Sequence, residues 1–179
     1  MHFELRHTFE APVADVLEAM YDPALPEYLK AHMKLIQDIK PIERVDEGGL
    51  VRRKTRYVPV PIIKSVGPKE IPPEALAWVE ESTYDRAARR VTFKNIGEHA
   101  KVRKHLENGG TLTFRDAGSG RCERIVAGEL KITNLSFLLR PLGILAEQII
   151  VSNAKSILNE EARVFGEFIK QRKTAAASA

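Results

Sequence analysis

LGILAEQIIVSNAKSILNEEARVFGEFIKQRK, residues 142–173, is the stretch that decides the fold. Its apolar residues recur with a period of 3.6 and form a broad stripe over roughly eight turns. The stripe contains Ile144, Leu145, Ile149, Ile150, Ile157, Val164, Phe165, Phe168 and Ile169, with Asn153 among them. A helix of this length has to bury so wide a stripe against a large partner. The pattern therefore predicts a long C-terminal helix that ends near Lys173, followed by a disordered tail at 174–179.

The sequence before this helix predicts a sheet. Residues 2–10 alternate apolar and polar side chains, as a half-buried strand does. Two short helical patterns follow, at 13–22 and 24–33. The rest is almost wholly strand and turn, with strands expected at 35–45, 50–60, 75–84, 90–96, 105–116 and 121–133. Short polar turns between consecutive strands indicate an antiparallel meander.

This order of elements predicts an α+β fold. A curved antiparallel sheet of about six or seven strands would wrap around the long C-terminal helix, with two short helices after the first strand. The 179 residues suit one domain, which we place at 1–173. The 59–73 segment carries five prolines, and it is expected to be a loop.

Composition and charge exclude several classes of function. The single cysteine, Cys122, excludes an intrachain disulfide, and the five scattered histidines form no ligand pair, so we expect no metal and no cofactor. The basic run at 52–56 divides between the two faces of a strand, which disfavours nucleic acid as a partner. The N-terminus lacks the apolar run of a secretory signal, and the apolar stretch at 135–151 is interrupted. A cytoplasmic protein is therefore expected.

A cavity between sheet and helix is one reading of the strand residues. A strongly twisted sheet around one helix need not be filled at its wide end. Glycines 109, 110 and 128 fit bulges or bends and remove side-chain volume. Several candidates for the inner face are small or polar: Thr55, Ser82, Thr83, Asn108 and Thr111. The same residues would suit a filled core near a barrel mouth, so periodicity leaves both readings open.

The whole chain resembles the START-like superfamily, also called SRPBCC or Bet v 1-like. The resemblance rests on HFELRHTFEAPVADVLEAMYD at 2–22, on the turn at 46–49 and on the final helix. Within that group the chain is similar to an uncharacterised bacterial family of the DUF2505 type. It also has a faint similarity to PRELI-type phospholipid-transfer domains, through His7-x-Phe9, Pro12 and residues 151–155.

The resemblance implies a helix-grip fold with an elongated cavity for a hydrophobic molecule. We therefore expect a noncatalytic carrier or sensor of a hydrophobic ligand, a lipid in the first instance. Two alternatives stay open: a START-like enzyme of the polyketide cyclase or aromatase type, and a protein–protein adaptor that uses the same groove.

Two arginines and several aromatic side chains are the candidate ligand-binding residues. Strict alternation puts Arg53 and Arg124 on the inner face, where a guanidinium needs an anionic partner. That partner is either an acidic ligand head group or a structural carboxylate, Glu81 or Glu129. The remaining candidates to line a cavity, each of which would equally suit the core, are Tyr57, Trp78, Phe93, Phe114, Ile149 and Asn153.

Acid–base catalysis is the enzymatic alternative. A titratable side chain inside an apolar cavity would have a perturbed pKa and could transfer a proton. The candidates are His7, Tyr57, Glu81 and Tyr84, but no spacing brings two of them together.

Two apolar segments flanked by cations are candidates for contact with an anionic membrane. Their contact residues would be Ile62, Ile63, Lys64, Phe137, Leu138 and Leu139. The alternatives are lids that pack on the core, or an interface of a homodimer. The sequence leaves monomer and homodimer open.

Overall fold

The computed structural model of the protein describes residues 1–61, 65–66, 69–70, 72–134 and 140–177. Its elements follow the predicted order, with short additions. They are β1 (His2–Phe9), α1 (Val13–Met20), α2 (Leu25–His32), β2 (Ile36–Glu47), β3 (Leu50–Pro59), β4 (Ser65–Val66), β5 (Lys69–Glu70), η1 (Pro73–Leu76), β6 (Trp78–Asp85), β7 (Arg90–Gly97), α3 (Ala100–His105), β8 (Leu106–Gly118), β9 (Arg121–Ile132) and α4 (Arg140–Ala177).

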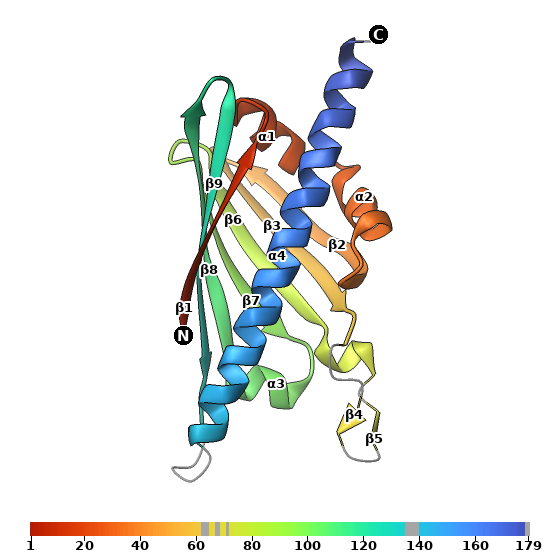
Figure 1. The fold of residues 1–179 in the computed structure, drawn as a ribbon, viewed down its shortest axis with the longest axis vertical. Coiled ribbons are helices and arrows are strands. Elements are labelled where there is room, and N and C mark those ends of the chain that lie inside the picture. Colours follow the sequence, from red (N-terminus) through yellow and green to blue (C-terminus); the bar gives the residue numbers. More distant parts are fainter. Residues whose placement is uncertain (62–64, 67–68, 71, 135–139, 178–179) are drawn as a thin grey trace.

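Seven strands form one antiparallel sheet in the order β1-β9-β8-β7-β6-β3-β2. The hairpins β2–β3, β6–β7 and β8–β9 turn where glycine or polar residues predicted a turn. Gly48 and Gly49 in the first of these turns, and Gly118 and Gly120 in the last, take positive φ. Pro41 lies in β2, which is an edge strand, where a missing N–H donor breaks no central ladder. The curved sheet holds α4 diagonally across its concave face (Figure 1). This is the helix-grip fold, and the predicted fold class is confirmed.

Four local predictions differ from the structure. The short hairpin of β4 and β5 lies in the segment predicted as a loop, and α3 precedes the strand predicted from residue 105. Helix α4 continues to Ala177 rather than ending near Lys173, because the alanines of the predicted tail favour helix. The sheet has register irregularities at 36–38, 41–43 and 116–118, and none at the glycines predicted to bend it.

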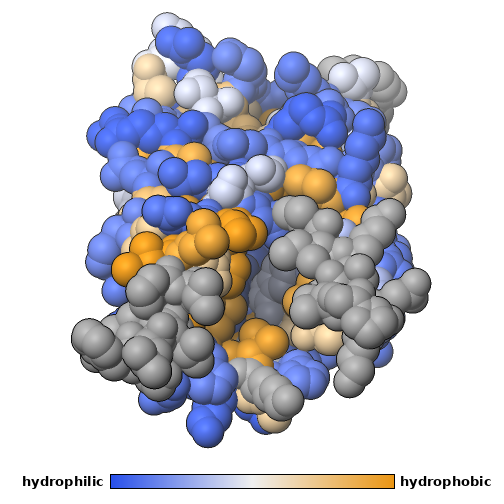
Figure 2. Space-filling model, turned by 60° about the horizontal axis from the view of Figure 1, so that its bottom comes forward, coloured by the Kyte–Doolittle hydropathy of each residue, from blue (hydrophilic) through white to orange (hydrophobic). Residues whose placement is uncertain are grey.

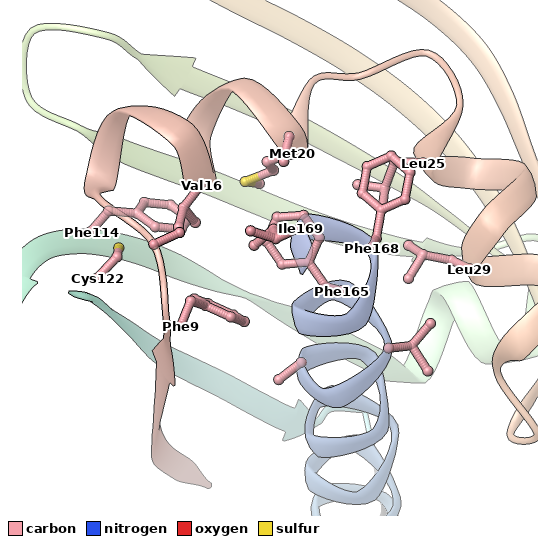
Figure 3. Close-up of a cluster of buried hydrophobic side chains, with 14 of the residues drawn as sticks. Phe9, Val16, Met20, Leu25, Leu29, Phe114, Cys122, Phe165, Phe168 and Ile169 are labelled. Atoms are coloured by element: carbon pink, nitrogen blue, oxygen red, sulfur yellow. The ribbon is translucent and has the colours of Figure 1, made fainter. Parts of the chain in front are cut away.

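At the end of the molecule where α1 and α2 lie, which we call the closed end, side chains form a packed apolar core. There α1 and α2 lie against the C-terminal half of α4 and the adjoining ends of the strands (Figures 1 and 3). The Phe9 and Phe165 rings meet edge to face with their centroids 5.2 Å apart. The cluster also contains Val16, Met20, Leu25, Leu29, Val51, Tyr84, Val91, Phe114, Cys122, Phe168 and Ile169. The interior of this end is therefore filled with side chains.

Burial decreases toward the opposite end. Along β7 the inner-face residue Val91 is buried, whereas Phe93 and Asn95 on the same face are only half-buried. Along β8, Phe114 is buried and Asn108 is half-buried. Figure 2 shows the end at which α4 begins, where hydrophobic side chains gather around a hollow. Inner-face burial thus decreases toward this end on β7 and β8, whereas Val126 and Leu130 of β9 stay fully buried.

No helix among the described residues is long and apolar enough to cross a membrane.

Candidate ligand site

Four polar residues form one row across the inner face of the sheet. Thr55 of β3 pairs in register with Glu80 of β6, Glu80 with Asn95 of β7, and Asn95 with Asn108 of β8. Each lies an even number of residues from a buried core residue of its own strand, so alternation puts all four on the face that α4 covers. We call these four residues the polar row.

The polar row contains an unsatisfied acceptor. Asn95 Oδ1 is buried and has no hydrogen-bond partner within the described part of the chain. A buried polar atom without a partner costs about 1–3 kcal/mol. Arg53 Nε and Arg124 Nε share this condition. Of these three atoms only Asn95 Oδ1 belongs to the polar row, where it is a group that a ligand or a water molecule can satisfy.

Glu80 is the titratable group of the row. Burial raises the pKa of its carboxyl, the Arg53 guanidinium opposes that rise, and the Glu161 carboxylate adds to it. Burial also raises the pKa of the Tyr57 phenol, and the nearby Glu80 carboxyl contributes in the same direction. The centre of the inner face therefore holds an acid whose proton is retained more strongly than that of an exposed glutamate.

The structure shows why sequence reasoning selected Glu81 rather than Glu80. Both residues are glutamates in one strand, and only the choice of the inner face separates them. Ser82 and Tyr84 are buried, so Glu80 shares their face, and Glu81 is exposed on the other one, where its carboxylate lies 3.7 Å from Lys54 Nζ. Alternation from Ser82 would have found Glu80. Thr83 and Thr111 were predicted inside, but both pair with Thr92 on the outer face.

Arg53 lies on the inner face as predicted, but its surroundings differ from the prediction. Its Nη1 donates to the Met20 carbonyl oxygen at 3.1 Å, and its guanidinium lies 4.6 Å from the centre of the Tyr21 ring. Neither Glu81 nor Glu129 is its partner, because both lie on the outer face. The nearby carboxyl that acts on it is that of Glu80. The guanidinium of Arg53 thus already contacts other groups of the protein, the Met20 carbonyl oxygen and the Tyr21 ring.

Arg124 is the centre of a clasp between sheet and helix. Its side chain is 3% exposed, and Nη2 lies 2.5 Å from Glu161 Oε2 of α4. Nη2 also lies 3.2 Å from His7 Nδ1, and His7 Nε2 lies 3.0 Å from Asn159 Oδ1. Sequence reasoning left open a structural ion pair and an acidic ligand, and the ion pair is present with a different partner. Glu161 was not predicted as the partner of Arg124, because 37 residues separate the two in the sequence.

Aromatic rings form part of the wall of this space. The Tyr57 and Trp78 rings stack with centroids 5.3 Å apart, two residues along β3 and β6 from the polar row and on the same face. The Phe3 and Phe93 rings lie so close to two glycines that a Cβ on Gly128 or on Gly110 would meet them, at 2.2 Å and 3.0 Å. These glycines therefore make room for protein rings rather than for a ligand, which corrects the predicted bulges.

The remaining predicted ligand-binding residues divide among different places. Phe114 belongs to the packed core and lies on β8 six residues from Asn108. Asn153 is half-buried, but Ile149 is 46% exposed, as are Ile144 and Leu145 to a similar extent. The N-terminal turns of α4 thus do not bury the whole predicted stripe. The predicted membrane-contact residues, which lie outside the described residues, are Ile62, Ile63, Lys64, Phe137, Leu138 and Leu139.

The described residues contain no group of three or more His, Cys, Asp or Glu side chains that could hold a metal ion. Cys122 is buried in the packed core, and burial raises the pKa of its thiol to about 11. It lies apart from the polar row.

Comparison with known proteins finds solved structures of the same architecture but assigns the chain to no family. No protein-family model matches the chain, and no curated protein matches it. The resemblances to the DUF2505 type and to PRELI domains therefore stay predictions.

Solved structures share the fold at low sequence identity. A protein of Thermus thermophilus aligns over 100% of both chains with a TM-score of 0.63 and 19% identity. The Zhui aromatase/cyclase of Streptomyces aligns over 98% of this chain and 97% of its own, with a TM-score of 0.64 and 15% identity. Norcoclaurine synthase of Thalictrum flavum, in complex with dopamine and hydroxybenzaldehyde, aligns over 96% and 87%, with a TM-score of 0.64 and 14% identity. By architecture, this chain is a helix-grip protein with the Bet v 1-like fold of these structures.

Proposed function

We propose that this protein binds a small, mainly hydrophobic molecule between α4 and the inner face of the sheet, with a polar group of that molecule on the polar row. The observation that carries the proposal is Asn95 Oδ1, a buried acceptor without a partner among the described residues. It lies on a half-buried strand face near the aromatic pair of Tyr57 and Trp78. An apolar space with a few convergent polar groups is the usual form of a small-molecule site.

The comparisons support the proposal at the level of fold. Norcoclaurine synthase was solved with dopamine and hydroxybenzaldehyde, so this architecture has room for small molecules in at least one protein. Helix-grip neighbours also include aromatase/cyclases. Identities of 14% and 15% carry no residue over to this chain, and the argument rests on its own side chains.

The experiment is native mass spectrometry of the purified protein, followed by solvent extraction and identification of copurifying molecules. We expect an added mass that organic solvent removes. The variant Asn95→Leu places an apolar side chain on the polar row and should lose the added mass. Thr92→Leu, on the opposite face of the same strand, is the matched control and should keep it. Equal retention by both variants would refute the assigned site.

We favour a lipid as the hydrophobic ligand. In this proposal the protein carries or senses the lipid and does not convert it chemically. Ile144 and Leu145 near the start of α4 are exposed, as are Val60 and Leu76. Hydrophobic surface is visible at the end where α4 begins (Figure 2). Loading from an anionic membrane through the segments around 62–64 and 135–139, in a cytoplasmic monomer or homodimer, is part of the same proposal. Vesicles that contain anionic lipid should then bind the protein, and the binding should weaken with added salt.

Acid–base catalysis is the second candidate, and Glu80 favours it. A buried carboxyl with a raised pKa, beside the Tyr57 phenol, holds its proton more strongly than an exposed glutamate and is a candidate to give it to a ligand. If the ligand is a substrate, Glu80→Gln should keep binding and abolish its conversion. A copurifying molecule that is unchanged after long incubation with the wild-type protein would favour the carrier.

A further inference from the structure

The chemistry of the polar row defines the kind of polar group that fits it. Asn95 Oδ1 is an acceptor and needs a donor. Its cross-strand neighbour on the β6 side is Glu80, whose carboxyl oxygens accept hydrogen bonds in either protonation state. A ligand group at this position therefore meets acceptors on neighbouring strands, about 5 Å apart across the sheet.

Anionic groups fit this position poorly. A ligand carboxylate has no proton to give to Asn95 Oδ1, and it would lie beside the Glu80 carboxyl. Arg53, which sequence reasoning assigned to an acidic head group, already donates to the Met20 carbonyl oxygen and lies against the Tyr21 ring. The second inner-face arginine, Arg124, is paired with Glu161. An acidic head group would have to compete with these contacts.

Cationic groups also fit poorly. An ammonium group would donate to Asn95 Oδ1, but its desolvation needs a fully charged carboxylate as a partner. Burial disfavours the charged form of Glu80. The Arg53 guanidinium adds a positive charge near the same carboxyl, so a second cation would meet repulsion there.

We propose that the ligand carries an uncharged hydroxyl group, a phenol or an alcohol, which donates its hydrogen bond to Asn95 Oδ1 beside Glu80. This inference rests on the proposed function and names the ligand chemistry of the same site. A hydroxyl oxygen also accepts, so the same group can take a hydrogen bond from a neighbouring donor while its own proton serves Asn95. The stacked rings of Tyr57 and Trp78 are a suitable wall for the apolar body of such a molecule.

Four naphthalene derivatives, substituted at the same ring position, test the inference with the wild-type protein by isothermal titration calorimetry. They are naphthol, methoxynaphthalene, naphthoate and naphthylmethylamine, which differ in donor capacity and charge at similar size. Loss of a hydrogen bond to a buried acceptor costs about a factor of ten in affinity. We therefore expect naphthol to bind about tenfold more tightly than each of the other three.

Variants then assign the preference to a residue. Asn95→Leu should remove the advantage of naphthol over methoxynaphthalene, and Thr92→Leu should keep it. Asn95→Ala is the second variant should the leucine variant not fold. Tighter or equal binding of naphthoate or naphthylmethylamine by the wild-type protein overturns the inference while ligand binding stands. Failure of all four compounds to bind, with a copurifying molecule still present in native mass spectrometry, overturns this inference alone. Failure of all four together with no copurifying molecule overturns the proposed function as well.

Discussion

Arg124 Nη2 of β9 and Glu161 Oε2 of α4 lie 2.5 Å apart, and this ion pair fastens the long helix to the sheet. The pair lies beside the packed core, because Arg124 pairs in register with Phe114 and its guanidinium lies 5.3 Å from the centre of the Phe9 ring. Its guanidinium is nearly inaccessible to water, so the carboxylate is the group that compensates its charge. Three elements meet here, because His7 of β1 contacts the same guanidinium.

Removing one partner of this pair should destabilise the fold strongly. Glu161→Gln leaves the Arg124 charge buried without its anion, and breaking such a pair typically costs about 3 kcal/mol or more. Urea denaturation should show this loss in the free energy of unfolding. The control is Glu167→Gln, which removes the partner of Arg163 in an exposed pair on the same helix and should change stability by roughly 0.5 kcal/mol or less. Equal effects of the two variants would show that the Arg124 clasp is not a stabilising contact.

His7 should make stability depend on pH. Burial lowers the pKa of its imidazole below its ordinary value of 6.5, and the Arg124 guanidinium lowers it further. The unfolded chain therefore binds a proton at a higher pH than the folded chain, so the free energy of unfolding should fall as pH decreases through about 6.5. His7→Asn should flatten this part of the profile, whereas His2→Asn, at an exposed position of the same strand, should keep the wild-type shape. An unchanged profile in His7→Asn would contradict this assignment.

Glu80 should behave in the opposite sense. Because burial raises the pKa of its carboxyl in the folded state, the unfolded chain releases the proton first. Stability therefore falls as pH rises above about 4.5, the ordinary pKa of a glutamate. Glu80→Gln should therefore raise the free energy of unfolding at pH 7, and the gain should shrink toward pH 4. Glu81→Gln, on the outer face, is the matched control. A loss of stability in Glu80→Gln at every pH would instead identify the carboxylate as a structural partner of Arg53.

The two glycines beneath aromatic rings should differ in tolerance. A Cβ on Gly110 would lie 2.2 Å from the Ala127 carbonyl oxygen, which is backbone, whereas a Cβ on Gly128 would meet the far end of the Phe3 ring at the same distance. Gly128→Ala should cost about 1–3 kcal/mol, as overpacking usually does, and Gly110→Ala should cost more. Thermal denaturation of both variants measures the order. Phe3→Ala should suppress the cost of Gly128→Ala and leave that of Gly110→Ala, and a uniform effect would disprove the ring contact.

Cys122 should be unreactive in the folded protein. Burial raises the pKa of its thiol to about 11, so little thiolate exists at neutral pH, and the packed core blocks reagents. A thiol reagent such as Ellman's reagent should modify it slowly in buffer and completely in urea. Since this is the only cysteine in the chain, the signal needs no further mutation. Rapid modification in buffer would mean that the closed end opens easily.

Periodicity determined the architecture of this protein. A 3.6-residue period identified α4, alternation and polar turns identified the strands, and their order allowed one arrangement, a sheet around a helix. Local patterns are sufficient for these elements because the hydrogen bonds of a helix and the alternation of a strand are local properties.

The tertiary structure decided the candidate site. Alternation separates Glu80 from Glu81, but Ser82 and Thr83 were both candidates for the inner face, so only the packing against the strand decides which glutamate faces α4. The pairing of Arg124 with Glu161, the row from Thr55 to Asn108, and the rings above Gly110 and Gly128 all join residues from different strands or from the helix. Such contacts follow from strand register and helix placement. The difference between the filled and the half-buried end likewise comes from where α1 and α2 pack, which no single segment of the sequence determines.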